Sequence, residues 1–91
     1  MDFELPNVWK ASNEQLAKLC GKVAGAEPGD FTAALQEEAK RLYAIWVDSF
    51  QLPDKHDSNH FEEQERKAGI QASLRKRTIE VLVKAEQQSN A

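Results

Sequence analysis

Apolar residues recur at three-and-four spacing over three stretches of the chain, and this pattern predicts an all-α, three-helix bundle. The stretches cover residues 13–24, 31–51 and 60–87. In each stretch the apolar positions fall on one side when successive residues are turned by about 100°. No stretch alternates with the period of two that a half-buried strand requires. We therefore expect one helical domain over residues 1–91.

The first predicted helix, 13–24, opens on a capping box. Ser12 and Gln15 stand three residues apart, so the hydroxyl and the amide can satisfy each other's backbone donors. Gly25 is expected to end the helix. Ahead of it, the apolar residues fit neither period, and we expect an extended N-terminal arm laid across the bundle, formed by Phe3, Leu5, Val8 and Trp9.

The second predicted helix, 31–51, carries the most regular apolar stripe in the chain. Asp30 stands where a side chain can cap the helix, and Pro53 follows where a helix ends. Toward the end of the helix, additional apolar residues widen the arc, which indicates burial on more than one side. The stripe consists of Phe31, Leu35, Ala39, Leu42, Trp46 and Phe50, and the widening residues are Tyr43, Ile45 and Val47.

The third predicted helix, 60–87, carries two apolar stripes. We expect the Asn59 side chain to cap it and the Glu62 side chain to accept a hydrogen bond from the backbone N–H of Asn59. An apolar arc of more than half the circumference needs two neighbours. Gly69 weakens the middle by about 1 kcal/mol relative to Ala. One stripe contains Phe61, Ala68, Ala72, Ile79 and Val83, and the other contains Ile70, Leu74, Val81 and Ala85.

The apolar excess on the second and third helices has two interpretations. Either the first helix and the arm cover all of it, which gives a closed monomer, or part of it is an interface. A chain of 91 residues hides only about 60–65% of its unfolded surface, so a monomeric core is marginal. We therefore favour a homodimer formed through the second and third helices, with interface residues Tyr43, Val47, Ile70, Leu74, Val81 and Ala85.

Composition and charge narrow the functional classes. With 41% hydrophobic and 30% charged residues, the chain has the composition of a water-soluble globular protein. Its net charge of −3 argues against a protein whose whole surface attracts nucleic acid. It has no apolar run of the length that a membrane span needs, and its beginning lacks the pattern of a secretory signal. The compartment we expect is the cytoplasm.

The strongest local charge bias lies between Arg66 and Lys84. Six basic residues in this segment face one acid, Glu80, and several of them align along the helix as a basic ridge. Such a ridge supports an alternative function, a nucleic-acid-binding regulator with contacts from Arg66, Arg75, Lys76, Arg77 and Lys84. We favour a solvated outer face instead, because the chain is acidic and no aromatic residue is interleaved for base stacking.

Candidate catalytic and metal-binding residues are few. His56 and His60 are four residues apart, but Pro53 places His56 in a loop, so the two rings are not held at helical spacing. Cys20 lies on the apolar stripe of the first helix and is expected to be an inert core residue. The adjacent acids Glu37 and Glu38 point about 100° apart, which does not make a paired-carboxylate site. We expect no enzyme, no metal and no cofactor.

These patterns lead to one functional expectation. The chain should be a non-catalytic protein-interaction module, a small cytoplasmic regulator, adaptor or inhibitor that binds another protein and forms a homodimer. Small accessory proteins of bacteria, plasmids and phages are often of this kind. Because a helical fold supports many unrelated functions, the partner itself does not follow from the sequence.

Overall fold

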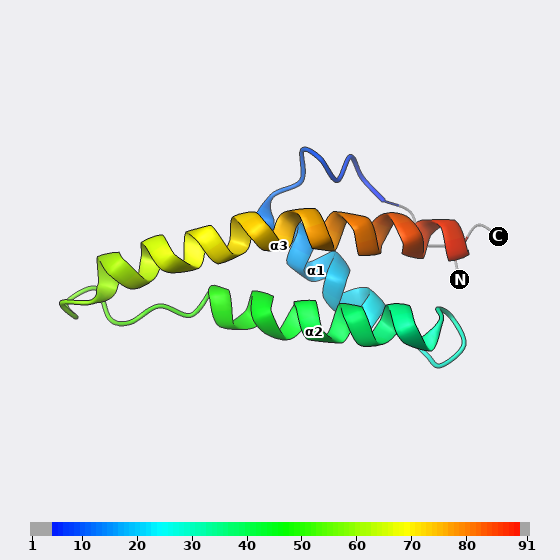
Figure 1. The fold of residues 1–91 in the computed structure, drawn as a ribbon, viewed down its shortest axis with the longest axis horizontal. Coiled ribbons are helices and arrows are strands. Elements are labelled where there is room, and N and C mark those ends of the chain that lie inside the picture. Colours follow the sequence, from blue (N-terminus) through cyan, green and yellow to red (C-terminus); the bar gives the residue numbers. More distant parts are fainter. Residues whose placement is uncertain (1–4, 90–91) are drawn as a thin grey trace.

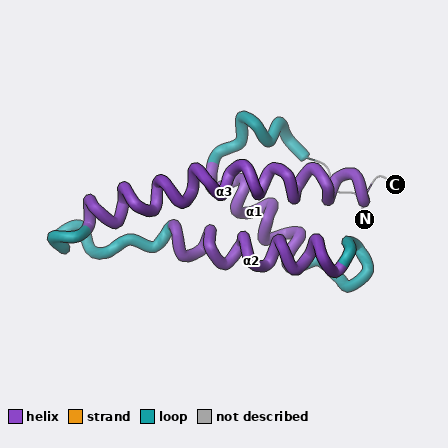
Figure 2. Tube along the Cα trace, viewed as in Figure 1, coloured by secondary structure: helices purple, strands orange, loops and turns teal. Residues whose placement is uncertain are grey.

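The computed structural model describes residues 5–89, and over that range it is a three-helix bundle with no strand. Helix α1 spans Asn13–Ala24, α2 spans Ala33–Ser49 and α3 spans His60–Ser89. Figure 1 shows α2 and α3 side by side and antiparallel, with α1 lying across them from behind. The remaining described residues are loops and the N-terminal arm (Figure 2). The predicted fold class is confirmed.

The molecule is elongated because one helix is much longer than the others. Its principal extents are 50 × 25 × 16 Å and its radius of gyration is 14.5 Å, whereas a compact chain of this length has a radius of gyration of about 12 Å. Helix α3 has 30 residues, which corresponds to about 45 Å at 1.5 Å per residue. Helix α3 therefore sets the length of the molecule.

Helix α1 begins and ends as its sequence predicts. Ser12 Oγ accepts a hydrogen bond of 3.2 Å from the backbone N–H of Gln15. The backbone N–H of Ser12 donates to Gln15 Oε1 at 2.9 Å, which completes the capping box. At the other end, the N–H of Gly25 donates to the carbonyl of Gly21. Local hydrogen bonds therefore fix both ends of this helix.

Helix α2 is shorter than predicted at both ends. Its cap is Thr32 and not Asp30, because Thr32 Oγ1 accepts from the backbone N–H of Leu35 at 3.3 Å. The helix ends at Ser49, whose hydroxyl donates to the carbonyl of Trp46 at 2.7 Å. Short polar side chains of this kind compete with the helical backbone for its hydrogen bonds. The spacing of the apolar residues did not predict that the polar residues Thr32 and Ser49 would bound the helix.

Lys67 on α3 closes the end of α2. Its side chain is buried, and its ammonium donates to the carbonyl of Asp48 at 3.0 Å and to the carbonyl of Gln51. The last carbonyls of a helix have no partner within the helix, so a cation placed there satisfies them and complements the helix dipole. Lys67, one of the six basic residues between Arg66 and Lys84, therefore joins α2 to α3.

The core lies where all three helices meet, and Trp46 is at its centre. The indole is fully buried, and its Nε1–H donates to the hydroxyl of Thr78 on α3 at 2.8 Å. Its ring stacks on Phe50 with the centroids 5.9 Å apart. The other large buried side chains are Leu16, Cys20 and Val23 of α1, Leu42 of α2, and Leu82 of α3. One satisfied polar pair is therefore enclosed in an apolar core.

The structure reverses the expected roles of the two stripes on α3. Leu74, Val81 and Ala85, from the stripe expected to be in excess, are buried in the core. In the other stripe Ile79 is buried, whereas Phe61 is 77% exposed, and Ala68 and Ala72 are exposed as well. The sequence predicts two apolar stripes but not which one faces α1.

The position of α1 along α3 explains this exposure. Asn13 is the first residue of α1, and its side chain donates to Gln71 Oε1 at 3.1 Å. Asn13 Oδ1 also accepts from Arg75 at 2.9 Å. Residues 60–70 of α3 therefore lie beyond the end of α1, and Figure 1 shows this part of α3 extending past it. Apolar side chains there have no third helix to cover them.

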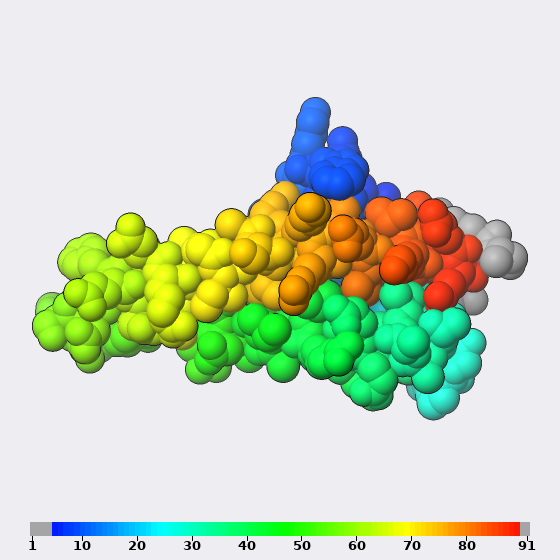
Figure 3. Space-filling model, in the orientation of Figure 1, coloured from blue at the N-terminus to red at the C-terminus, as the bar shows by residue number. Residues whose placement is uncertain are grey.

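The N-terminal arm crosses α3 on the side away from α2. The guanidinium of Arg75 donates to the carbonyl of Ala11 at 2.8 Å, and the backbone N–H of Leu5 donates to Glu86 Oε2 at 3.2 Å. Val8 is buried, whereas Trp9 is 72% exposed. In Figure 3 the arm stands above α3 as a blue ridge. The arm residue Phe3 lies outside the described range.

The hydrogen bond between Trp46 and Thr78 gives a test of the core. We expect Thr78→Val to lower the free energy of unfolding by about 1–3 kcal/mol, because it keeps the shape of the side chain but leaves the buried indole N–H without a partner. Urea denaturation measures the change. In a Trp46→Phe background the same substitution should have a much smaller effect, and an equal effect in both backgrounds would contradict the role assigned to this bond.

Candidate functional site

The structure divides the six residues predicted to form an interface. Leu74 is 4% exposed, Val81 is 6% exposed and Ala85 is fully buried. These three side chains pack against the chain's own helices, so their assignment to a partner surface is corrected. Tyr43 and Val47 are exposed and Ile70 is half-buried. Only these three remain accessible to a partner.

One accessible surface, which we call the α1–α2 patch, consists of Tyr43, Val47, Phe50 and Leu52. These four side chains are each 40–44% exposed, and the first three border a small hollow with Ala17 of α1. The Tyr43 ring lies on Gly21, where an added Cβ would stand 2.6 Å from Tyr43 Cε1. A side chain at position 21 would therefore displace the ring.

The other accessible surface, the α2–α3 groove, runs between the two long helices, from Arg66 to Arg77 along α3. It has a volume of about 500 Å³. Ile45, 40% exposed, lines it from α2. At Gly69 an added Cβ would meet no atom within 4 Å, so this part of the groove is open. The residues of the groove are Ile45, Arg66, Gly69, Ile70, Ser73, Leu74 and Arg77.

The predicted interface therefore belongs to two separate surfaces. Tyr43 and Val47 lie on the flank of α2 that borders α1, whereas Ile45 lies on the flank that borders the groove. Ile70 belongs to the groove and not to the patch. Periodicity shows that α2 has apolar residues on both sides of its core stripe, but the positions of α1 and α3 decide which surface each residue joins.

The predicted basic ridge does not form one surface. Arg66 pairs with Glu63 on the same helix, with Nη2 and Oε2 2.7 Å apart. The hydrogen bonds from Arg66 hold the pKa of the Glu63 carboxyl below its ordinary value. Arg75 donates to Ala11 and Asn13 and so fixes the arm and α1. Arg75 is therefore a structural residue and not a ridge contact.

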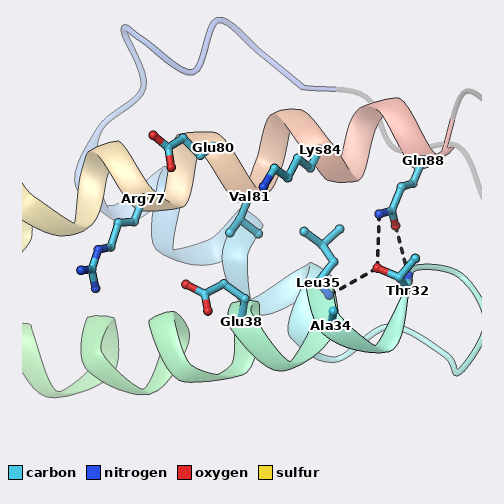
Figure 4. Close-up of a pocket in the computed structure, with 9 residues that line it drawn as sticks. All are labelled: Thr32, Ala34, Leu35, Glu38, Arg77, Glu80, Val81, Lys84 and Gln88. Carbon is cyan, nitrogen blue, oxygen red and sulfur yellow. Dashed lines mark hydrogen bonds between the residues drawn. The ribbon is translucent and has the colours of Figure 1, made fainter.

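Lys76, Arg77 and Lys84 remain exposed on α3, with Glu80 among them. Arg77, Glu80 and Lys84 border a second groove between α2 and α3, in which Arg77 points toward α2 and Glu80 points away from it (Figure 4). Glu38 of α2 adds another negative charge to this groove. The charges along this groove are therefore mixed, which does not favour contact with a phosphate backbone.

The same groove is closed at its end by a pair of polar side chains. The backbone N–H of Thr32 donates to Gln88 Oε1 at 3.1 Å. Gln88 Nε2 donates back to Thr32 Oγ1 at 3.3 Å, and Figure 4 shows both bonds. These contacts hold the start of α2 against the end of α3. Their role is therefore structural.

Groups with nucleophilic or metal-binding chemistry lie apart from one another. The thiol of Cys20 is buried and donates to the carbonyl of Ala39 at 3.3 Å. His60 Nδ1 lies 2.9 Å from the carbonyl of Pro53, whereas His56 lies in the exposed loop before α3. Within residues 5–89, no three His, Cys, Asp or Glu side chains are grouped so that they could hold a metal ion.

Comparison of the chain with protein-family models, with curated proteins and with solved structures finds no match. In the described range, none of the three helices combines the length and the apolar character that crossing a bilayer requires.

The buried thiol predicts a pH dependence of stability. Burial, with a contribution from Glu38, raises the pKa of Cys20 from 9.0 to about 12. The unfolded chain loses this proton first, so the contribution to stability is complete below pH 9 and is lost as the pH rises toward 12. The loss is at most about 1.4 kcal/mol per pH unit.

Urea denaturation between pH 8 and pH 11 measures this effect. The free energy of unfolding of Cys20→Ala should fall less steeply with pH than that of the wild type, because the variant has no thiol to ionise. The two proteins differ only at position 20, so the difference between the two slopes isolates Cys20. Identical slopes would contradict the assigned pKa.

Proposed function

We propose that this protein is a non-catalytic protein-interaction module, a small cytoplasmic regulator, adaptor or inhibitor that works as a homodimer through α2 and α3. The observation that carries the proposal is the pair of apolar surfaces left exposed after the core has closed. The α1–α2 patch and the α2–α3 groove lie on opposite flanks of α2. Two such surfaces allow one copy to bind a second copy and another protein at the same time.

The exposed area supports an additional partner. A compact monomer of 10.3 kDa exposes about 5,400 Å², whereas this chain exposes 6120 Å². The difference, about 700 Å², is close to the roughly 800 Å² that each partner buries in a standard interface. One further contact surface of ordinary size would therefore bring the chain to the exposure of a compact protein.

We assign the α2–α3 groove to the homodimer and the α1–α2 patch to the other protein. The groove presents Ile45 and Ile70 beside the open position at Gly69, and helices on both sides make it suitable for a third helix. The patch is more aromatic, with Tyr43 and Phe50. Aromatic side chains are enriched in the centres of protein–protein interfaces.

The assignment predicts which substitution dissociates the dimer. Ile70→Glu should convert the protein to a monomer at micromolar concentration, because it replaces an apolar contact of the interface by a charged side chain that would have to be buried. Sedimentation equilibrium measures the mass of the variant and of the wild type, for which we expect twice the monomer mass.

Val47→Glu is the matched control, since it introduces the same charge at an exposed position in the α1–α2 patch. It should remain a dimer. A wild-type monomer across the micromolar range would refute the proposed homodimer. Dissociation by Val47→Glu but not by Ile70→Glu would move the dimer contact to the patch. Circular dichroism checks that each variant keeps its helical content.

A further inference from the structure

We propose that the occupant of the α2–α3 groove is α3 of a second copy, antiparallel to the first, with the two-fold axis between Gly69 and Ile70. This inference rests on the proposed homodimer and specifies its geometry. A two-fold contact is isologous, so each residue that touches the second copy is touched in return by the same pair of residues. Every contact therefore occurs twice, once on each side of the axis. The correct register must give each groove residue a suitable neighbour in the second copy.

Gly69 is the first feature that this register explains. It stands inside a 30-residue helix, where glycine is about 1 kcal/mol less favourable than alanine. No side chain within its own copy requires a glycine there, because the space around it is open. An axis between Gly69 and Ile70 places each of these residues opposite the other, so the Ile70 side chain of one copy lies over the bare backbone of the second.

The charges on α3 fix the same register independently. Arg66, Gly69, Ser73 and Arg77 line the groove. Glu62 falls on the same side of the helix, so all five residues lie within about 80° of one another around it. Glu62 and Arg77 lie equally far from the proposed axis on its two sides. An antiparallel pair therefore brings Glu62 of each copy opposite Arg77 of the other, which makes two ion pairs between the copies.

The two oppositely charged residues that meet, Glu62 and Arg77, are among those without an ion-pair partner in the described range. The ion pairs formed among residues 5–89 join Lys40 with Glu37, Arg41 with Glu38, and Arg66 with Glu63. Glu62 and Arg77 take part in none of them. Arg66, whose charge is already balanced by Glu63, lies opposite the neutral Ser73 of the second copy. The charge pattern is therefore complementary at every one of these positions.

Two other arrangements of the same helices bring like charges together. An axis between Gln71 and Ala72 would place Arg66 opposite Arg77 of the second copy. A parallel pair would place Arg66 beside Arg66 and Arg77 beside Arg77. Like charges directly opposite one another across an interface are unfavourable. The antiparallel register centred between Gly69 and Ile70 avoids both conflicts.

Charge reversal tests the register. Glu62→Arg alone and Arg77→Glu alone should each weaken the dimer about tenfold at low ionic strength, because each change replaces two opposite-charge contacts by two like-charge contacts. An equimolar mixture of the two variants should restore the dimer, since every contact in the mixed pair again joins opposite charges. Sedimentation velocity measures the dissociation constants. Lys84→Glu, an exposed charge change on α3 outside the groove, should leave the dimer unchanged.

The outcomes separate this inference from the homodimer itself. A wild-type dimer that neither single variant weakens would refute the register and leave the homodimer standing, as would single variants that do not recover on mixing. A wild-type monomer would refute the homodimer and with it the register. Binding of the wild type only to a different protein would have the same consequence.

Gly69→Ala gives a second test, because it should change the stability of the monomer and the affinity of the dimer in opposite directions. The substitution should raise the thermal unfolding midpoint of the monomer, measured at low concentration, because alanine favours the helix and meets open space. The same substitution should weaken the dimer several-fold, since the added methyl group stands where Ile70 of the second copy packs. A dimer that becomes tighter would overturn the proposed contact.

Discussion

The length mismatch between α1 and α3 is the constraint on which the structure depends. A helix of 12 residues covers about 18 Å and one of 30 residues about 45 Å, so α1 can enclose a core along only part of α3. The hydrogen bonds of Asn13 to Gln71 and Arg75 set where that coverage ends. The closed core and the uncovered residues 60–70 of α3 both follow from this single boundary.

Within the covered part, a polar pair gives the core its specificity. Apolar side chains alone tolerate small shifts of one helix along another, whereas the buried indole of Trp46 must find an acceptor. Thr78 provides that acceptor at 2.8 Å and so fixes the register of α2 against α3. Lys67 fixes the same two helices at the other end of the contact through the carbonyls that close α2. The position of the groove is therefore determined by contacts outside it.

The sequence predicted the helices well, because periodicity and caps are local. The bounds of α1 were correct, since Ser12, Gln15 and Gly25 act on neighbouring backbone groups. The candidate surface was harder to predict because it depends on which helix lies against which stripe. Leu74, Val81 and Ala85 were placed on the surface but lie in the core, and Arg75 was placed on a basic ridge but fixes the arm. These errors share one cause, which is that the path of α1 across α3 cannot be predicted from the spacing of apolar residues along each helix.

The central claim is that α3 of a second copy packs antiparallel in the α2–α3 groove, centred between Gly69 and Ile70. An isotope-filtered nuclear Overhauser spectrum tests it most directly, on an equimolar mixture of labelled and unlabelled protein. The account predicts intermolecular signals between the Ile70 methyl groups and the Gly69 α protons. Intermolecular signals from Tyr43 and Val47 instead, or none at a concentration where the protein is dimeric, would contradict it.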